Sequence, residues 1–148
     1  SIKFLPYGVT VDEFQHEVYE NPELTPKERR MKWLEIERKY LPSRYYEDIP
    51  ELDEAIFFYR QGHLFSVPFY YIDYTLAQVC AFQFWKKANE NREKAWKEYL
   101  HLCKLGGTKP FLELVKEANL ENPFEDGTIS NIVPELRKYI DSVDATKF

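Results

Sequence analysis

The sequence predicts an all-α protein. Over most of the chain, apolar residues recur at intervals of three and four, the spacing of one helix face. Proline, glycine and N-capping residues separate these segments, as expected at helix boundaries. No segment shows convincing strand alternation or an internal repeat. We therefore expect about six helices in the 148 residues.

Residues 1–20 are expected to form the end of a helix. Val11 and Phe14 share one face of the pattern, and Asn21-Pro22 stops it. Pro6 lies inside the pattern and predicts a kink, because proline lacks the N–H of a helical hydrogen bond.

The second helix has a complete start signal. Thr25 is the expected N-cap, Pro26 takes the first helical position, and Glu28 completes a T-x-x-E capping box. The helix is expected to end at about Tyr40, before Leu41-Pro42. Its inward residues are predicted to be Met31, Leu34 and Ile36.

Residues 42–61 mix aromatic and acidic side chains, and predict a loop followed by a short helix or extended segment that leads to Gly62 and His63. The next helix, from about Pro68 to Asn89, is apolar on almost every side. Such a helix is typical of a buried position, because a surface helix keeps a polar face.

Three further helices follow from local signals. Asn91 is the expected cap of a helix that ends at Gly106-Gly107. Thr108 is expected to cap a short helix through Ala118, and Thr128 to start the last helix.

Composition argues against a nucleic-acid-binding protein and a membrane-spanning one. The net charge is −5, and no basic stripe is present to neutralise the phosphates of a nucleic acid. No apolar run approaches the ~20 residues of a membrane span. Cys80 and Cys103 lie in apolar helical patterns, so we interpret them as reduced core thiols of a cytoplasmic protein.

A narrow stripe of polar aromatic residues marks the central helix. Tyr71, Tyr74 and Gln78 lie on one side, and Phe82 and Trp85 continue the same line. Hydroxyl and amide groups on a buried helix need hydrogen-bond partners. The partners are either protein carbonyls, in which case the stripe is core, or a substrate.

The segment from Gly62 to Trp85 carries a resemblance to a known family. It reads G-H-L-F-S-V-P-F-Y-Y-I-D-Y-T-L-A-Q-V-C-A-F-Q-F-W and resembles the active-site helix of oligoendopeptidase F, a family of zinc metallopeptidases related to thimet oligopeptidase. The likeness extends upstream to Pro6-Tyr7-Gly8 and downstream to the segment 123–127, so it covers nearly the whole chain.

The sequence departs from this family in one respect, because the zinc motif H-E-x-x-H is absent. The resemblance therefore implies that residues 1–148 are the C-terminal helical portion of the peptidase catalytic domain. The intact enzyme would use zinc and cut internal bonds of short peptides. Its N-terminal portion would supply two zinc histidines, a glutamate base and a third ligand.

We expect this chain alone to hold no zinc and to be inactive. His16 lies in H-E-x-x-E, with Glu20 where a second histidine would be needed, and two ligands do not make a zinc site. The alternative function is a non-catalytic helical interaction module derived from the same fold.

The resemblance also implies site residues. His63 matches a family histidine that faces the substrate. Tyr74 is expected to donate a hydrogen bond to the carbonyl oxygen as it gains negative charge, with Tyr71 beside it on the substrate carbonyl. Tyr70 lies ~100° round the helix and is predicted to be core. The alternative for the tyrosines is core packing, with hydroxyls bonded to backbone carbonyls.

Overall fold

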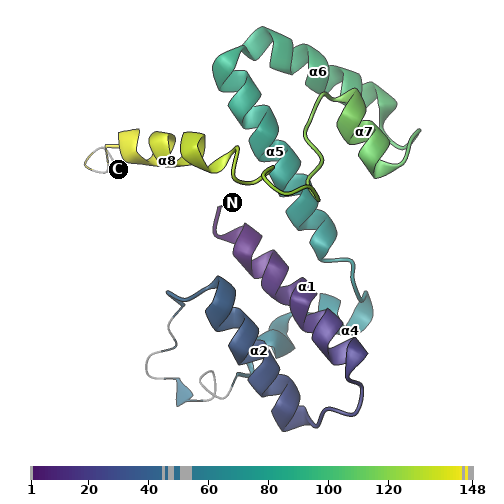
Figure 1. Cartoon of the computed structure of the whole chain (residues 1–148), viewed down its shortest axis with the longest axis vertical. Coiled ribbons are helices and arrows are strands. Elements are labelled where there is room, and N and C mark those ends of the chain that lie inside the picture. Colours follow the sequence, from purple (N-terminus) through teal and green to yellow (C-terminus); the bar gives the residue numbers. More distant parts are fainter. Residues whose placement is uncertain (1, 45, 47–48, 51–54, 145, 147–148) are drawn as a thin grey trace. The chain divides into compact units, whose positions relative to one another are not determined.

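The computed structural model describes residues 2–44, 46, 49–50, 55–144 and 146. Within them the chain contains seven α-helices and one 3-10 helix, and no strand (Figure 1). The prediction of an all-α fold is therefore confirmed.

The chain divides into two compact units, Ser1–Leu76 and Ala77–Phe148. The boundary falls within the long helix α5 (Ile72–Glu90). No composition shift or linker in the sequence indicates this division. Each unit is described separately below.

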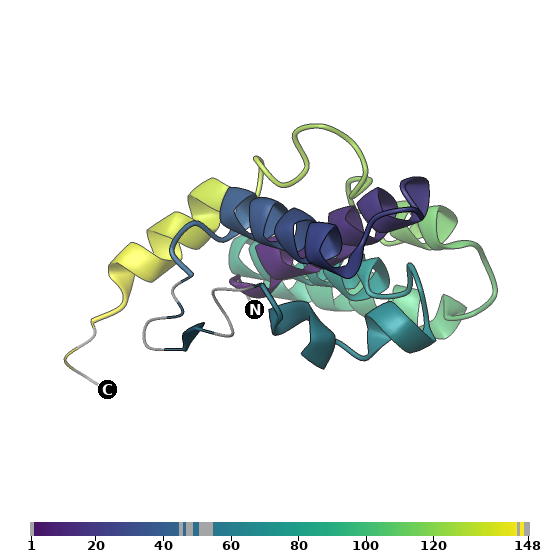
Figure 2. The same cartoon turned by 90° about the horizontal axis from the view of Figure 1, so that it is seen from below.

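The first unit is built on α1 (Phe4–Glu20) and α2 (Pro26–Tyr40), which lie side by side in Figures 1 and 2. The predicted capping box is confirmed at α2. The Glu28 N–H donates to Thr25 Oγ1 at 3.3 Å, and the Thr25 N–H donates to Glu28 Oε2 at 2.8 Å. Both helices end where predicted, at Glu20 and Tyr40, with Asn21 and Leu41 as their C-caps.

Pro6 does not interrupt α1, contrary to the expected kink. The helix begins at Phe4, so Pro6 lies in its first turn. The first N–H groups of a helix have no partner within the helix, and a missing N–H there costs no hydrogen bond.

Aromatic rings form the core of this unit. Trp33 is fully buried, and its ring contacts Phe14 edge-on at 5.3 Å between ring centroids and Phe58 at 5.6 Å. The prediction that Met31 faces inward is wrong, since its side chain is 55% exposed, whereas Leu34 and Ile36 are buried as expected. The buried face centres on Trp33 and Glu37, roughly 200° and 240° round the helix from Met31.

Gly8 allows α1 and the start of α5 to approach closely. A Cβ at position 8 would overlap the Thr75 hydroxyl and lie 3.2 Å from Thr75 Cβ. Thr75 itself is buried, so its side chain has little room to move. The close approach sets the distance between α1 and the first turn of α5.

We therefore predict that Gly8→Ala destabilises the chain. Alanine gains ~1 kcal/mol of helix propensity over glycine, but overpacking in a core costs ~1–3 kcal/mol, so a net loss of about 1 kcal/mol is expected. Thermal unfolding of Gly8→Ala would measure it. Gly62→Ala is the matched control, because a Cβ at position 62 would have no other atom within 4 Å. An unchanged melting temperature for Gly8→Ala would contradict the close packing.

The segment before α5 contains two short helices, the 3-10 helix η1 (Phe57–Arg60) and α4 (His63–Ser66). This agrees with the expected short helix before His63, although residues 45, 47–48 and 51–54 of that prediction lie outside the described residues.

The central helix starts later than predicted, at Ile72 instead of Pro68. Phe69 has a φ of 60°, a left-handed conformation that does not continue a right-handed helix. Its N–H donates to Gln15 Oε1 on α1 at 2.7 Å, which holds this turn against α1.

The expectation of a helix buried on every side is also corrected. Four residues of α5 are buried, namely Thr75, Val79, Phe82 and Gln83. Tyr74 is 43% exposed. The tyrosine end of the stripe is therefore accessible in this chain.

The second unit contains α6 (Arg92–Leu105), α7 (Phe111–Glu117) and α8 (Val133–Ser142) after the end of α5. Asn91 caps α6 as predicted, with Oδ1 accepting from the Lys94 N–H at 3.0 Å. Gln83 on α5 makes two hydrogen bonds with the backbone of Glu121 in the loop after α7. Its Oε1 accepts from the Glu121 N–H at 2.7 Å, and its Nε2 donates to the Glu121 carbonyl at 3.0 Å.

Two predicted caps are wrong. Thr108 Oγ1 donates back to the Leu105 carbonyl at 2.6 Å, so Thr108 belongs to the end of α6, and α7 begins after Pro110. Thr128 Oγ1 donates to the Asn122 carbonyl at 2.7 Å within the preceding loop. In both cases the hydroxyl has a local carbonyl as an alternative to the helix start.

Two further findings concern the cysteines and the possibility of a membrane span. Cys80 and Cys103 are both free, but Cys103 is exposed and is not a core residue. None of the described helices has the length and apolar character needed to cross a bilayer.

Candidate functional site

The rings of four residues in the first unit contact one another. We call them the aromatic cluster: His63, Tyr70, Tyr71 and Tyr74. The His63 ring lies edge-on to Tyr71 at 5.1 Å and to Tyr74 at 5.9 Å between centroids. Tyr71 and Tyr74 contact each other at 5.6 Å. The structure thus brings together the three residues selected from the sequence, although they come from two different helices and a turn.

Tyr70 belongs to the cluster and is not core. It is 45% exposed, stacks on His63 at 6.3 Å with an interplanar angle of 11°, and meets Tyr74 edge-on at 5.3 Å. The helical rotation used to place it inward does not apply, because α5 begins only at Ile72.

Gln61 connects the cluster to α1. Tyr7 Oη donates to Gln61 Oε1 at 2.8 Å, and Gln61 Nε2 lies 2.7 Å from His63 Nδ1. Tyr7 also meets Tyr71 edge-on at 5.9 Å. Sequence reasoning missed both Tyr7 and Gln61, because their contact spans 54 positions of the chain.

The phenols of this region hold their protons firmly. Burial raises the pKa of Tyr71 above its usual 10.0. Interaction with the Tyr70 hydroxyl, and then partial burial, raises the pKa of Tyr74. Burial and the neighbouring Tyr71 raise the pKa of Tyr7 to about 12. At neutral pH all three are uncharged hydrogen-bond donors.

The chemical capacity of the cluster follows from these properties. Tyr74 is exposed, while His63 and Tyr71 are half-buried, so their polar atoms are fixed by ring contacts yet open to a ligand. Phenol hydroxyls and an imidazole N–H in such a group can donate to a carbonyl oxygen, and more strongly to an oxyanion.

The other two histidines have ordinary surroundings. His16 Nε2 lies 3.5 Å from Asp12 Oδ2 on the same helix, and its ring packs against Phe69. His101 is exposed, with Nε2 3.2 Å from Glu117 Oε2. Among the described residues, no group of three or more His, Cys, Asp or Glu side chains could hold a metal ion.

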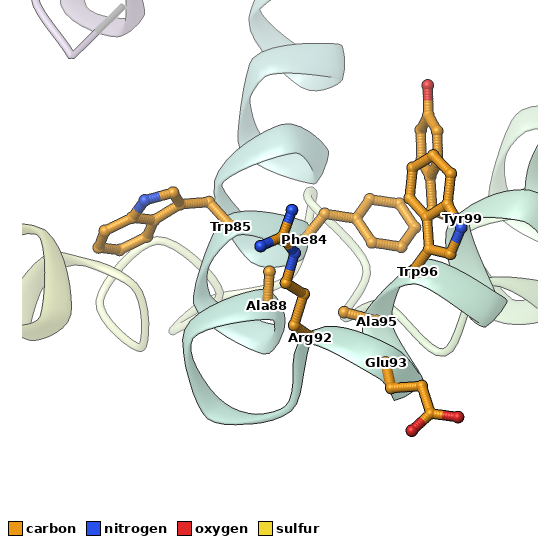
Figure 3. Close-up of a pocket in the computed structure, with 8 residues that line it drawn as sticks. All are labelled: Phe84, Trp85, Ala88, Arg92, Glu93, Ala95, Trp96 and Tyr99. Carbon is orange, nitrogen blue, oxygen red and sulfur yellow. The ribbon is translucent and has the colours of Figure 1, made fainter.

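An apolar hollow of about 670 Å³ lies in the second unit between α5 and α6. Figure 3 shows Phe84 pointing from α5 toward Trp96 and Tyr99 of α6, whereas Trp85 points away from them. Phe84 meets Tyr99 edge-on at 5.5 Å. Arg92 and Glu93 are its charged residues, and none of the predicted site residues lines it.

Comparison with known proteins identifies the family. The model of peptidase family M3 matches residues 3–133 of the chain. The chain therefore belongs to peptidase family M3. A search of curated proteins gave no match.

Solved structures give the same result. A crystal structure assigned as oligoendopeptidase F is 58% identical over 98% of the chain, with a TM-score of 0.92. PZ peptidase A, solved with an inhibitor, is 56% identical over 95% of the chain, with a TM-score of 0.90. An oligoendopeptidase F assigned in Bacillus anthracis strain Ames is 49% identical over 99% of the chain, with a TM-score of 0.76.

The chain spans 26%, 25% and 23% of the lengths of these three relatives, respectively. It corresponds to the helical C-terminal part of the oligoendopeptidase F structures. The resemblance drawn from the segment 62–85 is confirmed at the level of the family. The roles of individual residues stay predictions.

Proposed function

We propose that this chain is the C-terminal part of the catalytic domain of a zinc-dependent oligoendopeptidase that hydrolyses internal bonds of short peptides. It supplies the side chains that bind the substrate carbonyl, opposite a zinc site in the N-terminal portion of the enzyme. The observation that supports this proposal is the aromatic cluster, in which His63, Tyr71 and Tyr74 present hydrogen-bond donors on a partly exposed surface.

Tyr74 is the oxyanion donor in this proposal. Attack on a peptide bond moves negative charge onto the carbonyl oxygen, and a phenol donates a stronger hydrogen bond to an oxyanion than to a carbonyl. The raised pKa of Tyr74 keeps its proton in place for this task. Its 43% exposure leaves the side chain accessible from solvent.

Tyr71 and His63 hold the substrate before reaction. Tyr71 is half-buried, and its ring is fixed against Phe4 and Tyr7 of α1. A rigid donor of this kind positions a substrate carbonyl in the ground state. His63 contacts both tyrosines, so a single peptide group could reach all three side chains.

The reason for proposing zinc is the family resemblance and not any residue of this chain. Bound zinc would activate water and polarise the carbonyl in the intact enzyme. The described residues do not fit a zinc site, since they offer no cluster of ligands. The ligands would come from the remaining portion, and the two free thiols agree with a reducing, cytoplasmic location.

The proposal predicts that the 148 residues alone bind no zinc tightly and cut no peptide. A chimera tests whether these residues support catalysis when they are joined to a portion that carries the zinc site. These residues would replace the equivalent segment of the 58% identical oligoendopeptidase F, and cleavage of a quenched fluorescent peptide would be measured with the zinc content. We expect an active chimera and an inactive isolated chain. Stoichiometric zinc together with cleavage by the isolated chain would overturn the proposal that the zinc site lies in the N-terminal portion.

An interaction module remains the alternative function. The aromatic hollow between α5 and α6 favours it, because Trp96 is 57% exposed there. A chimera whose activity is unaffected by changes at His63, Tyr71 and Tyr74 would support this alternative.

A further inference from the structure

We propose that Gln61 and Tyr7 are positioning residues that hold His63 as the neutral tautomer with its proton on Nε2. The inference rests on the proposed function, in which His63 binds substrate, and it names the donor: His63 Nε2–H. The partner it suits is an uncharged peptide carbonyl.

The direction of the hydrogen bonds fixes the tautomer. Tyr7 Oη donates to Gln61 Oε1 at 2.8 Å, so the other end of the amide, the Nε2 donor, faces His63 Nδ1 at 2.7 Å. An N–H donor requires an acceptor, and Nδ1 accepts only when it carries no proton. The ring proton then lies on Nε2.

The reversed arrangement is less well satisfied. A flipped amide would accept from Nδ1–H and donate to the Tyr7 oxygen. The Tyr7 proton would then need another acceptor, and the only hydrogen bond that Tyr7 Oη makes with the described residues is the one to Gln61. Burial, which raises the pKa of Tyr7 to about 12, keeps that proton on the phenol. A partly buried hydroxyl proton left without an acceptor costs free energy.

We call the chain of hydrogen bonds Tyr7–Gln61–His63 the relay. Its Tyr7 end packs in the core of the first unit. The Tyr7 ring lies edge-on to the fully buried Trp33 at 6.4 Å and to Phe57 at 6.4 Å. The position of the phenol is therefore set by α1 and its packing, and Gln61 transmits it to the imidazole.

The free side of the imidazole is available to substrate. His63 is half-buried, and Nε2 has no hydrogen-bond partner within the described part of the chain. A second proton, on Nδ1, would set two N–H groups against each other across 2.7 Å. The histidine thus joins Tyr71 and Tyr74 as a third uncharged donor, a set suited to carbonyl oxygens of a peptide backbone.

NMR of the 148-residue chain tests the tautomer directly. The chain has three histidines, so histidine labelled with ¹⁵N gives a simple long-range ¹H–¹⁵N spectrum, which His63→Gln assigns. We expect the Nε2–H pattern for His63 at neutral pH, with His16 and His101 as internal references. An Nδ1–H pattern for His63 in the wild-type chain would overturn the proposal.

Gln61→Glu is the decisive variant. A carboxylate accepts but cannot donate, so the proton should move to Nδ1, while the spectra of His16 and His101 stay unchanged. Asn89→Asp makes the same amide-to-carboxylate change at an exposed position near the end of α5, and it should leave the His63 pattern as in the wild type. Tyr7→Phe removes the donor that orients the amide and should produce a mixture of tautomers. Circular dichroism would confirm that each variant is folded, and an unaltered His63 pattern in folded Gln61→Glu would refute the relay.

Kinetics of the active chimera separate this inference from the proposed function. Gln61→Glu should lower kcat/KM roughly tenfold to a hundredfold, the size of effect found for residues that orient a metal-bound histidine. Asn89→Asp should not change it. A tautomer change without any change in kcat/KM would leave the relay in place and overturn the role of His63 in substrate binding. Lower activity without a tautomer change would overturn the relay.

Discussion

Tyr74→Phe is expected to lower kcat of the intact peptidase by ~10²–10³, the effect of removing one oxyanion donor. The change deletes a single hydroxyl and keeps the ring that contacts His63, Tyr70 and Tyr71. KM should change much less, because the lost hydrogen bond is strongest in the transition state. The measurement is steady-state kinetics on the active chimera.

Stability and metal content distinguish this role from core packing. A buried tyrosine that loses a bonded hydroxyl costs roughly 1 kcal/mol of folding free energy and leaves kcat alone. Tyr74 is 43% exposed, so the melting temperature of Tyr74→Phe should be nearly that of the wild type. Zinc content should not change either, since Tyr74 is not proposed as a ligand.

Tyr139→Phe on α8 is the matched control, because its side chain is 57% exposed and lies outside the aromatic cluster. It should leave kcat unchanged. Tyr71→Phe should show a smaller loss in kcat than Tyr74→Phe, because Tyr71 is assigned to the ground-state carbonyl. A fully active Tyr74→Phe enzyme with a lowered melting temperature would refute the catalytic assignment.

The parts of the fold that the sequence predicted correctly depend on short-range signals. The capping box at Thr25 and Glu28, the cap at Asn91 and the stop at Asn21 are each decided within three or four residues. The wrong caps at Thr108 and Thr128 show the limit of the same rule, because a threonine hydroxyl bonds whichever local carbonyl or N–H is available.

Long-range contacts explain what the sequence could not predict. Phe69 leaves helical geometry where its N–H meets Gln15, 54 positions away, and this delays the start of α5. Glu37, 2% exposed, is buried at the centre of α2 because the Arg44 guanidinium lies 3.2 Å away and Tyr46 donates to it at 2.6 Å. A helical pattern alone would have placed this carboxylate on the surface.

For the candidate site too, the sequence identified some residues and missed others. The family resemblance selected His63, Tyr71 and Tyr74, and the structure places them in contact, although their roles are still untested. Tyr70 was missed because the helix was extended too far toward Pro68. Gln61 was missed because an amide gains significance only when its two partners are known.

Trp33→Ala is expected to have the largest effect on stability, a loss of ~3–5 kcal/mol in the free energy of unfolding. The side chain is fully buried, and its ring contacts Phe14, Phe58 and Tyr7. Truncation would leave a cavity that these rings cannot fill without moving. Chemical denaturation of the purified chain would measure the loss. Trp96→Ala is the control, because a 57% exposed tryptophan should change stability by less than about 1 kcal/mol.

Trp33→Phe separates the packing contribution from the polar atom. The indole Nε1 is buried without a hydrogen-bond partner among the described residues, so phenylalanine removes an unsatisfied donor while keeping most of the volume. Its loss of stability should therefore be well below that of Trp33→Ala. Because Tyr7 packs on Trp33, the alanine variant should also weaken the Tyr7–Gln61 contact and broaden the His63 tautomer signal. Equal stability of Trp33→Ala and Trp96→Ala would show that Trp33 does not anchor this core.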